Sequence, residues 1–465
     1  MNAVRRVATE EGDVAAALDM TARDGTAKAA GRLKDGHGAR WPNRTGGALE
    51  KCAIVRRMPR GPIALVLSTL IILTAGTAGA QDDTRAELLA RQRAEKAAQA
   101  QPYQPTKIEK ALLFVEEWNP LGKIAPHNGF FIQYGYTGKP IGSGIAVGAG
   151  WRHDLFGGTA RLVLEGGNSF RGYRMSRADL FMPRLLNGKL EIGLETSYKR
   201  HSQEDFYGVG LDSKLEDRAN FKYKSPEVQG RVMVTPVPWL NAGVRLGWQS
   251  VTVGPGTDDR FPTVPDRFPD AIAPGLREQP DFSYTDLFTT LDTRDQPGNA
   301  RQGSYLGVLW RRHHDLDLDR FSFDQIDIDA QQFLPIFDKK RVLALRVQLW
   351  ATSTEAGQFV PFYFQPTLGG STSLRSAPDF RYRGRNAIAT TLEYRWEAFS
   401  GLDMALFSDF GTVADSVGDL ELSDALDAYG IGLRFNTFKA VFFRLDVAAG
   451  GDDGIRTWFK FSKAF

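Results

Sequence analysis

The amino-acid sequence predicts an all-β protein, a 16-stranded antiparallel transmembrane β-barrel with a short N-terminal helical segment. From Phe130 onward, apolar and polar residues alternate with a period of two, which is the period of a strand with two different faces. Many of these runs span about 9–14 residues, the length at which a tilted strand crosses a membrane. Long and short connections between the runs also alternate, which is the third observation behind the prediction.

Composition limits the alternatives. The chain has 465 residues, a formal net charge of +3 and a mean hydropathy of −0.30. This hydropathy is too low for a bundle of membrane helices, and the net charge is too small to indicate nucleic-acid binding. Cys52 is the one cysteine, so the sequence excludes an intrachain disulfide and a zinc site made of cysteines.

The N-terminal part has the pattern of an export signal followed by a helix. Residues 58–80 combine basic residues, a short apolar core and a small-residue cleavage site before Gln81, which is typical of a signal peptide. Residues 1–57 are then expected to be a mis-annotated or disordered leader. Residues 81–128 are rich in helix-forming residues and are expected to form a periplasmic helical segment. Residues 129–465 are left for the barrel.

The strand pattern is clearest in Lys189–Lys199, which reads KLEIGLETSYK. Leu190, Ile192 and Leu194 fall on one face, and the two glutamates fall on the other. Apolar residues toward lipid and charged residues toward a water-filled lumen fit a closed barrel, which also satisfies every backbone hydrogen bond. Sixteen such runs are expected to start near Phe130, Gly144, Thr159, Phe170, Lys189, Phe221, Leu240, Phe282, Ser304, Arg320, Arg341, Ala387, Asp403, Tyr429, Ala440 and Thr457.

The connections sort by the parity of the strand that precedes them. Connections after even-numbered strands are mostly short, such as PVPW and FSG. The long ones, all after odd-numbered strands, are His201–Asn220, Val253–Asp281, Thr352–Asn386 and Ala414–Ala428. Short turns on one side and long loops on the other are the arrangement of a membrane barrel. The chain ends TWFKFSKAF, and Phe459, Phe461 and Phe465 share one face as the signal of a C-terminal barrel strand.

Three motifs, supported by FYGVG at Phe206–Gly210, carry a family resemblance. They are LDTRDQPGNARQGSYLGV (Leu291–Val308), LGGSTSLRSAPDFRYRGRNAIATTLEYRW (Leu368–Trp396) and ALFSDFGTVAD (Ala405–Asp415). In this order they resemble the bacterial surface antigen barrel of the BamA/TamA superfamily. The resemblance implies sixteen strands in the outer membrane of a Gram-negative cell.

The resemblance also implies that the sixth extracellular loop folds into the lumen, where an arginine contacts an F-x-D-x-G motif on strand thirteen. Carried over by position, the arginine is Arg375 and its partners are Phe407, Asp409 and Gly411. Gly369, Gly370 and Leu374 precede the arginine in the loop motif. The family pattern has glycine and an aromatic residue after the arginine, where this chain has Ser376 and Ala377.

Two alternatives stay open for this loop. Arg383, which Gly384 follows, is a competing tip of the loop motif, and the loop is otherwise an ordinary charged loop in solvent. We expect the arginines around it, Arg381, Arg383 and Arg385, to lie in the water-filled lumen or at its rim. The pattern FRGY (Phe170–Tyr173) matches the short family motif better than the loop sequence does, but it lies in a hairpin too short to reach inside the barrel.

The eighth connection is predicted to be an anchored periplasmic turn. Pro297 and Gly303 favour turns, and Asp292, Arg294 and Asp295 are expected to form a local charge cluster there.

No enzyme, cofactor or metal site is predicted. RRHHDLDLD (Arg311–Asp319) has histidine and aspartate close together, but a solvated loop end is the expected reading. Members of the resembled family that insert proteins carry periplasmic POTRA repeats, and residues 81–128 are too few for one. We therefore expect a barrel-only member that acts in assembly or translocation, or alternatively a passive pore or structural surface antigen. The expected partners are outer-membrane lipid, a periplasmic accessory protein and a nascent outer-membrane protein; nucleic acid is not expected.

Overall fold

The computed structural model describes residue 110 and residues 128–134, 146–337, 339–436, 441–451 and 453–460 of the chain. The predicted leader, the signal peptide and almost all of the predicted helical segment lie outside these residues, as do Phe461 and Phe465. Within the described ranges, no helix has the length and apolarity to cross a membrane.

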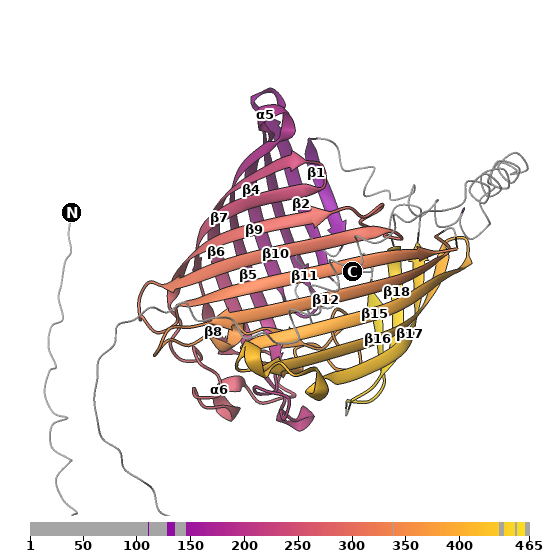
Figure 1. Cartoon of the computed structure of the whole chain (residues 1–465). Coiled ribbons are helices and arrows are strands. Elements are labelled where there is room, and N and C mark those ends of the chain that lie inside the picture. The colour runs from indigo at the N-terminus through magenta and orange to yellow at the C-terminus, as the bar shows by residue number, and fades with distance from the viewer. Residues whose placement is uncertain are drawn as a thin grey trace, which may run out of the picture. The chain divides into compact units, whose positions relative to one another are not determined.

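Sixteen strands of the described residues pair antiparallel in chain order and form one curved sheet (Figure 1). The first eight are β1 (Gly129–Tyr134), β2 (Ala146–Leu155), β3 (Ala160–Ser169), β4 (Arg174–Arg184), β5 (Leu190–Phe206), β6 (Ala219–Val237), β7 (Leu240–Ser250) and β9 (Asp281–Asp292). The other eight are β10 (Gly303–Asp315), β11 (Phe323–Ile336), β12 (Arg341–Ser353), β15 (Asn386–Phe399), β16 (Leu402–Ala414), β17 (Leu426–Asn436), β18 (Val441–Ala449) and β19 (Arg456–Lys460).

Shorter elements belong to the connections. The strand β8 (Thr252–Pro255) pairs with β6 beyond the end of β7, and β13 (Thr367–Leu368) pairs with β14 (Tyr382–Arg383). The helices are single turns: α5 (Leu185–Gly188), α6 (Val264–Arg267), η1 (Phe156–Gly158), η2 (Leu215–Asp217), η3 (Phe362–Phe364), η4 (Val417–Asp419) and η5 (Leu422–Asp424).

The two faces of the sheet have opposite character, as the alternation predicts. On the outer face, Leu194 is 55% exposed and Leu246 is 59% exposed. On the lumen face, Asp286 is fully buried between Arg245 at 3.0 Å and Arg311 at 2.5 Å. An ionised carboxylate tolerates burial when arginines on neighbouring strands neutralise it and satisfy its oxygens. Lipid-facing apolar residues and a polar, ion-paired interior are the two faces of a transmembrane barrel.

Long connections follow the odd-numbered strands of the barrel, as predicted, and their boundaries differ most from prediction at the first of them. The loop predicted at His201–Asn220 is shorter, because β5 continues to Phe206 and β6 begins at Ala219. A bulge between His201 and Glu204 lets the pairing continue. Beyond the bulge, Phe206 and Phe221 enter a buried apolar cluster with residues of later loops, and this burial favours the strand over a solvated loop.

The first and last strands are the two edges of the sheet that the described residues form. Among these residues, β1 pairs with β2 and β19 pairs with β18, and no register joins β1 to β19. Within the described part of the chain, each of these two strands therefore has a partner on one side only.

Candidate functional site

The connection between β12 and β15, residues 354–385, folds into the barrel and is called loop 6 below. Two glycines make its inward turn: Gly369 has φ +118° and Gly370 has φ +82°, values that favour glycine. A Cβ on Gly369 would lie 2.0 Å from the carbonyl oxygen of Pro378. Leu374 is 1% exposed and packs with Leu368 and Ala377 against the wall strands β15 and β16. This apolar contact holds the loop tip inside the lumen.

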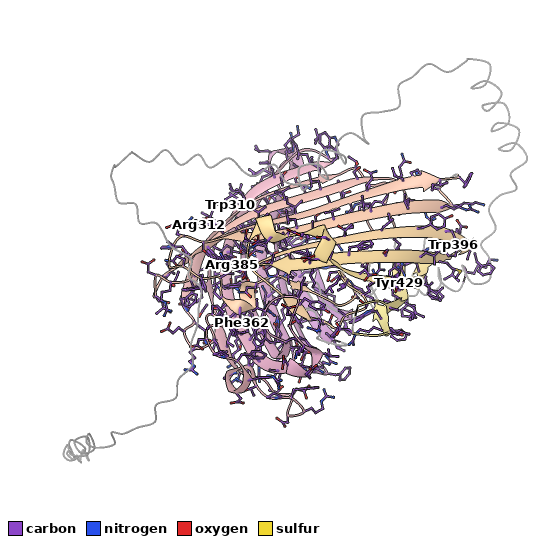
Figure 2. The ribbon with its side chains drawn as sticks, turned by 60° about the horizontal axis from the view of Figure 1, so that its bottom comes forward. Trp310, Arg312, Phe362, Arg385, Trp396 and Tyr429 are labelled. Atoms are coloured by element: carbon purple, nitrogen blue, oxygen red, sulfur yellow. The ribbon has the colours of Figure 1, made fainter. Side chains whose placement is uncertain are left out.

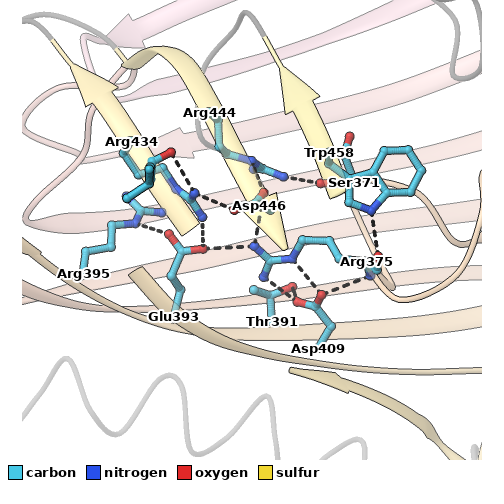
Figure 3. Close-up of polar contacts among 11 residues, drawn as sticks. Ser371, Arg375, Thr391, Glu393, Arg395, Asp409, Arg434, Arg444, Asp446 and Trp458 are labelled. Carbon is cyan, nitrogen blue, oxygen red and sulfur yellow. Dashed lines mark hydrogen bonds and ion pairs between the residues drawn. The ribbon is translucent and has the colours of Figure 1, made fainter. Parts of the chain in front are cut away.

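Arg375 follows Leu374 and makes the central contact of the site (Figure 3). Its Nε donates to Asp409 Oδ2 at 2.8 Å and its Nη2 donates to Oδ1 at 2.7 Å. The backbone N–H of Arg375 also donates to Asp409 at 3.2 Å. Arg375 is 2% exposed and Asp409 is fully buried. A bidentate, charge-assisted pair of this kind neutralises both buried charges, and its geometry holds the loop tip in one position.

The other two residues of the strand motif shape the space around the guanidinium. The ring of Phe407 lies under it, with 3.3 Å between Arg375 Cζ and the ring centroid, which adds a cation–π contact. Gly411 lies under Leu368, where a Cβ would be 2.9 Å from the leucine Cδ1. A side chain at Gly411 would therefore displace the loop. Both residues are on the lumen side, because Leu406 and Phe410 of the same strand are exposed toward lipid.

The pair belongs to a larger buried network of four arginines and three carboxylates. Glu393 of β15 accepts from Arg375 at 3.3 Å and from Arg434 at 2.9 Å. Further ion pairs of the network join Arg395 to Glu393 at 2.6 Å, Arg434 and Arg444 to Asp446 at 2.6 Å each, and Arg375 to Asp446 at 3.7 Å. Burial alone would lower the pKa of Arg375, but Asp409 and the other carboxylates raise its pKa above the usual value. The loop arginine is therefore charged throughout the physiological pH range.

The last two strands of the barrel hold the backbone of the loop tip. Trp458 Nε1 of β19 donates to the carbonyl oxygen of Arg375 at 2.7 Å. Arg456 Nε, also of β19, donates to the carbonyl oxygen of Ser376 at 3.1 Å. On β18, Arg444 donates to the carbonyl oxygen of Ser371. The tip thus contacts β16 through a side chain and β18 and β19 through its backbone.

Arg383, the competing tip, does not reach the strand motif. Its Nη1 donates to the carbonyl oxygens of Phe362 and Gln365, and it is 2% exposed. Arg381 is 4% exposed and bonds Ser213 at 2.7 Å and Asp453 at 3.1 Å. The expectation that these two arginines lie in a water-filled lumen was wrong, because both are buried. Oxygens of Ser213 and Asp453 replace the solvent around Arg381, and carbonyl oxygens of loop 6 itself replace it around Arg383.

The turn between β9 and β10 contacts distant strands in addition to forming part of the predicted local charge cluster. Arg294 binds Asp292 at 2.7 Å, but Asp295 instead binds Lys339 at 3.0 Å and accepts backbone N–H groups. Pro297 lies at the turn, and Gly303 has φ +102°. Arg301 continues inward and binds the buried Asp403 of β16 at 2.6 and 2.9 Å. Gly298 also accepts from the backbone N–H of Val441 at 3.1 Å, so the turn connects β9 and β10 to β16 and β18.

The histidine–aspartate run near Arg311 has a structural role rather than a solvated one. His313 is 1% exposed and stacks on Phe323, with ring centroids 4.3 Å apart. Asp315 accepts backbone N–H groups of the following loop, at 2.9 Å for Leu318 and 3.0 Å for Phe321. Among the described residues, no group of three or more His, Cys, Asp or Glu side chains could hold a metal ion.

Several residues of the site were not identified from the sequence. These are Glu393 and Arg395 on β15, Asp403 on β16, Arg434 on β17, Trp458 on β19, and Arg301 in the turn between β9 and β10. A weak signal exists for them, because charged residues at lumen-facing positions of a barrel require partners. Strand parity identifies such positions but does not say which of them meet. Of the predicted C-terminal signal, Phe459 is described and is 67% exposed on the outer face.

Known proteins resemble this chain in sequence family and in fold. The family model described as the Omp85 superfamily domain matches residues 179–463, more than half of the chain. Among solved structures, BamA from Haemophilus ducreyi lacking POTRA domains 1-3 matches with a TM-score of 0.55 at 17% identity, over 72% of this chain and 70% of that chain. A search of curated proteins gave no match.

Two CdiB structures match more weakly. CdiB from Acinetobacter baumannii has a TM-score of 0.44 at 14% identity, over 72% of this chain and 57% of that chain. CdiB from Escherichia coli has a TM-score of 0.46 at 14% identity, over 71% of this chain and 61% of that chain. The chain therefore spans less than two thirds of either CdiB chain.

The BamA match shows a shared fold, and the family match extends from β4 to the last strand. Together with the lipid-facing and lumen-facing sides of the sheet, these findings identify an outer-membrane β-barrel. The chain belongs to the Omp85 superfamily.

Proposed function

We propose that this barrel inserts or translocates outer-membrane proteins, and that its first and last strands separate when it does so. One observation carries the proposal. The tip of loop 6 contacts β16 through Arg375 and, at the same time, contacts β19 through Trp458. A loop held in this way must change its contacts whenever β19 moves away from β18 or from the lumen.

The edge position of β1 and β19 supports a movement of this kind. Among the described residues each pairs with one neighbour, β2 or β18, so its release breaks one ladder of backbone hydrogen bonds where release of a central strand breaks two. The two carbonyl bonds from Trp458 and Arg456 then oppose release of β19. In this proposal the loop acts as a lock on the closed state, with Arg375 and Asp409 as its anchor.

The substrate follows from the chemistry of an open edge. A released β1 or β19 presents a row of unpaired backbone N–H and C=O groups, which pairs with another extended chain. A nascent outer-membrane protein offers extended segments with unpaired backbone groups before it folds. A periplasmic accessory protein would deliver it to the barrel. Export through a signal peptide at residues 58–80 is part of the same proposal, and N-terminal sequencing of the mature protein, expected to begin at Gln81, tests it.

Reconstitution tests the proposed activity. The purified chain is placed in liposomes, a urea-unfolded outer-membrane barrel is added, and its folding is followed by heat-modifiability on gels. We expect faster folding than in empty liposomes. In cells, deletion of the gene is expected to lower the outer-membrane levels of other barrel proteins. Unchanged folding rates together with unchanged protein levels would contradict the proposal.

The alternative function is a passive pore or structural surface antigen. Planar-bilayer recordings distinguish the two, since a steady open conductance would favour the pore. The buried tip of loop 6 and the apolar cluster around Phe206, Phe221 and Phe362 support a filled lumen instead.

A further inference from the structure

Four basic residues lie next to one another on β4, β5 and β6. Arg174 is the register partner of Arg200, and Arg200 is the register partner of Lys224. Lys222 lies two residues before Lys224 on β6, so it shares the same face. These four residues, Arg174, Arg200, Lys222 and Lys224, are called the basic row below.

The basic row faces lipid rather than the lumen. Tyr198, two residues before Arg200, is 39% exposed, and Val228, four residues after Lys224, is 42% exposed on the outer face. Residues of the opposite parity point inward, where Lys199 and Glu227 form an ion pair at 2.9 Å. The alternation of side chains along a strand therefore places all four cations of the row outside the barrel.

The row lies at the extracellular end of the membrane-spanning wall. Arg174 is the first residue of β4 after the β3–β4 hairpin, which is on the side of the long loops. Tyr198 lies two residues, about 7 Å, nearer to the middle of the wall, and Trp248 is the register partner of Val228. Outward-facing tyrosine and tryptophan mark the interface between hydrocarbon and headgroups. The row is thus at the level of the headgroups of the outer leaflet.

Within the described residues, none of the four cations forms an ion pair. Three carboxylates at this end of the barrel bind other partners: Asp205 binds Arg218 at 2.9 Å, Asp217 binds Arg267, and Asp258 binds Arg260 at 2.8 Å. The Nε of Arg200 is buried and has no hydrogen-bond partner.

The arrangement is unfavourable unless an anion is present. Like charges at paired positions of neighbouring strands destabilise a sheet, and this row places three of them side by side. The outward-facing Arg312 at the same end of β10, labelled in Figure 2, gives the contrast. It binds Asp324 at 3.0 Å and Glu355 at 3.3 Å. The protein thus supplies carboxylates for Arg312 and none for the basic row.

We propose that the basic row binds the phosphate groups of the glycolipid that forms the outer leaflet of the membrane. Arginine forks and lysine ammonium groups are the usual protein partners of phosphate. Directly below the row, exposed Leu194, Val228 and Val232 offer an apolar surface for the acyl chains of the same molecule. This contact selects a lipid over a free phosphate ion.

Native mass spectrometry of the full chain in detergent tests the site with lipid A, a bis-phosphorylated, acylated disaccharide. We expect saturable binding by the unmodified chain. The double variant Arg200→Gln/Lys224→Gln is expected to bind roughly tenfold more weakly or worse, because it loses charge-assisted bonds to phosphate. The matched control Arg312→Gln, an outward arginine that already has carboxylate partners, is expected to bind normally. Lipid A without its phosphates is expected to bind weakly.

Three results would overturn the inference. They are normal lipid A binding by the double variant, equal binding of dephosphorylated lipid A, and binding of inorganic pyrophosphate as strong as that of lipid A. The last result would indicate a site for free anions. Heat-modifiability on gels checks that the variants are folded. If the first double variant does not fold, Arg174→Gln/Lys222→Gln tests the same row with the same expected loss.

Discussion

Removal of the Asp409 carboxylate is expected to destabilise the barrel strongly. The Asp409→Ala variant loses both oxygens that bind Arg375 at 2.7 and 2.8 Å. Arg375 stays buried at 2% exposure, with Glu393 at 3.3 Å as its nearest remaining carboxylate partner. Breaking a buried ion pair by removing one partner costs about 3–5 kcal/mol, because the other charge stays out of water. A loss within this range is expected for Asp409→Ala.

Arg383→Ala provides the comparison within the same loop. Arg383 bonds two backbone carbonyl groups and forms no ion pair with a described residue. Its removal leaves neutral acceptors unsatisfied, which costs about 1–3 kcal/mol. Arg375 and Arg383 are both 2% exposed. A difference between their losses of stability therefore reflects the carboxylate partner of Arg375 and not a difference in burial.

The assay is the urea concentration, or the temperature, at which the purified barrel loses its compact form on semi-native gels. The midpoint of Asp409→Ala and that of Arg375→Ala should each fall more than that of Arg383→Ala. The double variant Arg375→Ala/Asp409→Ala should lose less than the sum of the two single losses, since neither charge is left alone. Equal losses at Arg375 and Arg383, or additive losses in the double variant, would refute this reasoning.

Three further predictions concern contacts around the loop and the turn. Trp458→Phe removes the indole donor to the carbonyl oxygen of Arg375 and should cost about 1 kcal/mol; limited proteolysis should then cleave loop 6 faster, and an unchanged rate would contradict the contact. Arg301→Ala removes the Nη2 donor that bonds both oxygens of the buried Asp403 carboxylate. The free energy of unfolding should fall by about 3 kcal/mol or more, and hydrogen exchange in residues 293–302 should rise. Protection at the level of the unmodified chain would show that the turn is held by other contacts. Burial raises the pKa of Asp379 to about 6; since the folded state then binds this proton more tightly than the unfolded state, the stability from this group is present at about pH 4 and is lost as pH rises through 6. Asp379→Asn should flatten that dependence in unfolding midpoints measured from pH 4 to pH 7, and an identical slope in the variant would assign the dependence to another group.

The strand pattern could be predicted because it is local. Leu194 and Leu246 face lipid and Asp286 faces the lumen, as the period of two requires. The boundaries of β5 and β6 could not be predicted in the same way. The extension of β5 to Phe206 and the earlier start of β6 at Ala219 depend on Phe206 and Phe221 packing in one cluster with Phe362, a residue about 150 positions away in sequence.

The choice between Arg375 and Arg383 also depended on long-range contacts that the sequence does not show. Both arginines belong to one loop, and both have plausible neighbours in sequence. The path of the chain through Gly369 and Gly370 and the burial of Leu374 bring Arg375 to Asp409, while the β13–β14 pairing directs Arg383 to backbone carbonyls. The family resemblance predicted Arg375 as the loop arginine, but the position of Arg375 next to Asp409 depends on these long-range contacts.

By itself, the sequence determined the class of the fold, the two faces of each strand and the side of each long loop, because these depend on alternation and spacing along one segment. Only the tertiary structure decided which buried charges meet. Glu393, Arg434 and Asp446 surround Arg375 from three different strands, and Arg301 reaches Asp403 across the short-turn side. The physical reason is that a charge in a low-dielectric interior requires a partner within a few ångströms, and its position depends on the curvature of the whole sheet.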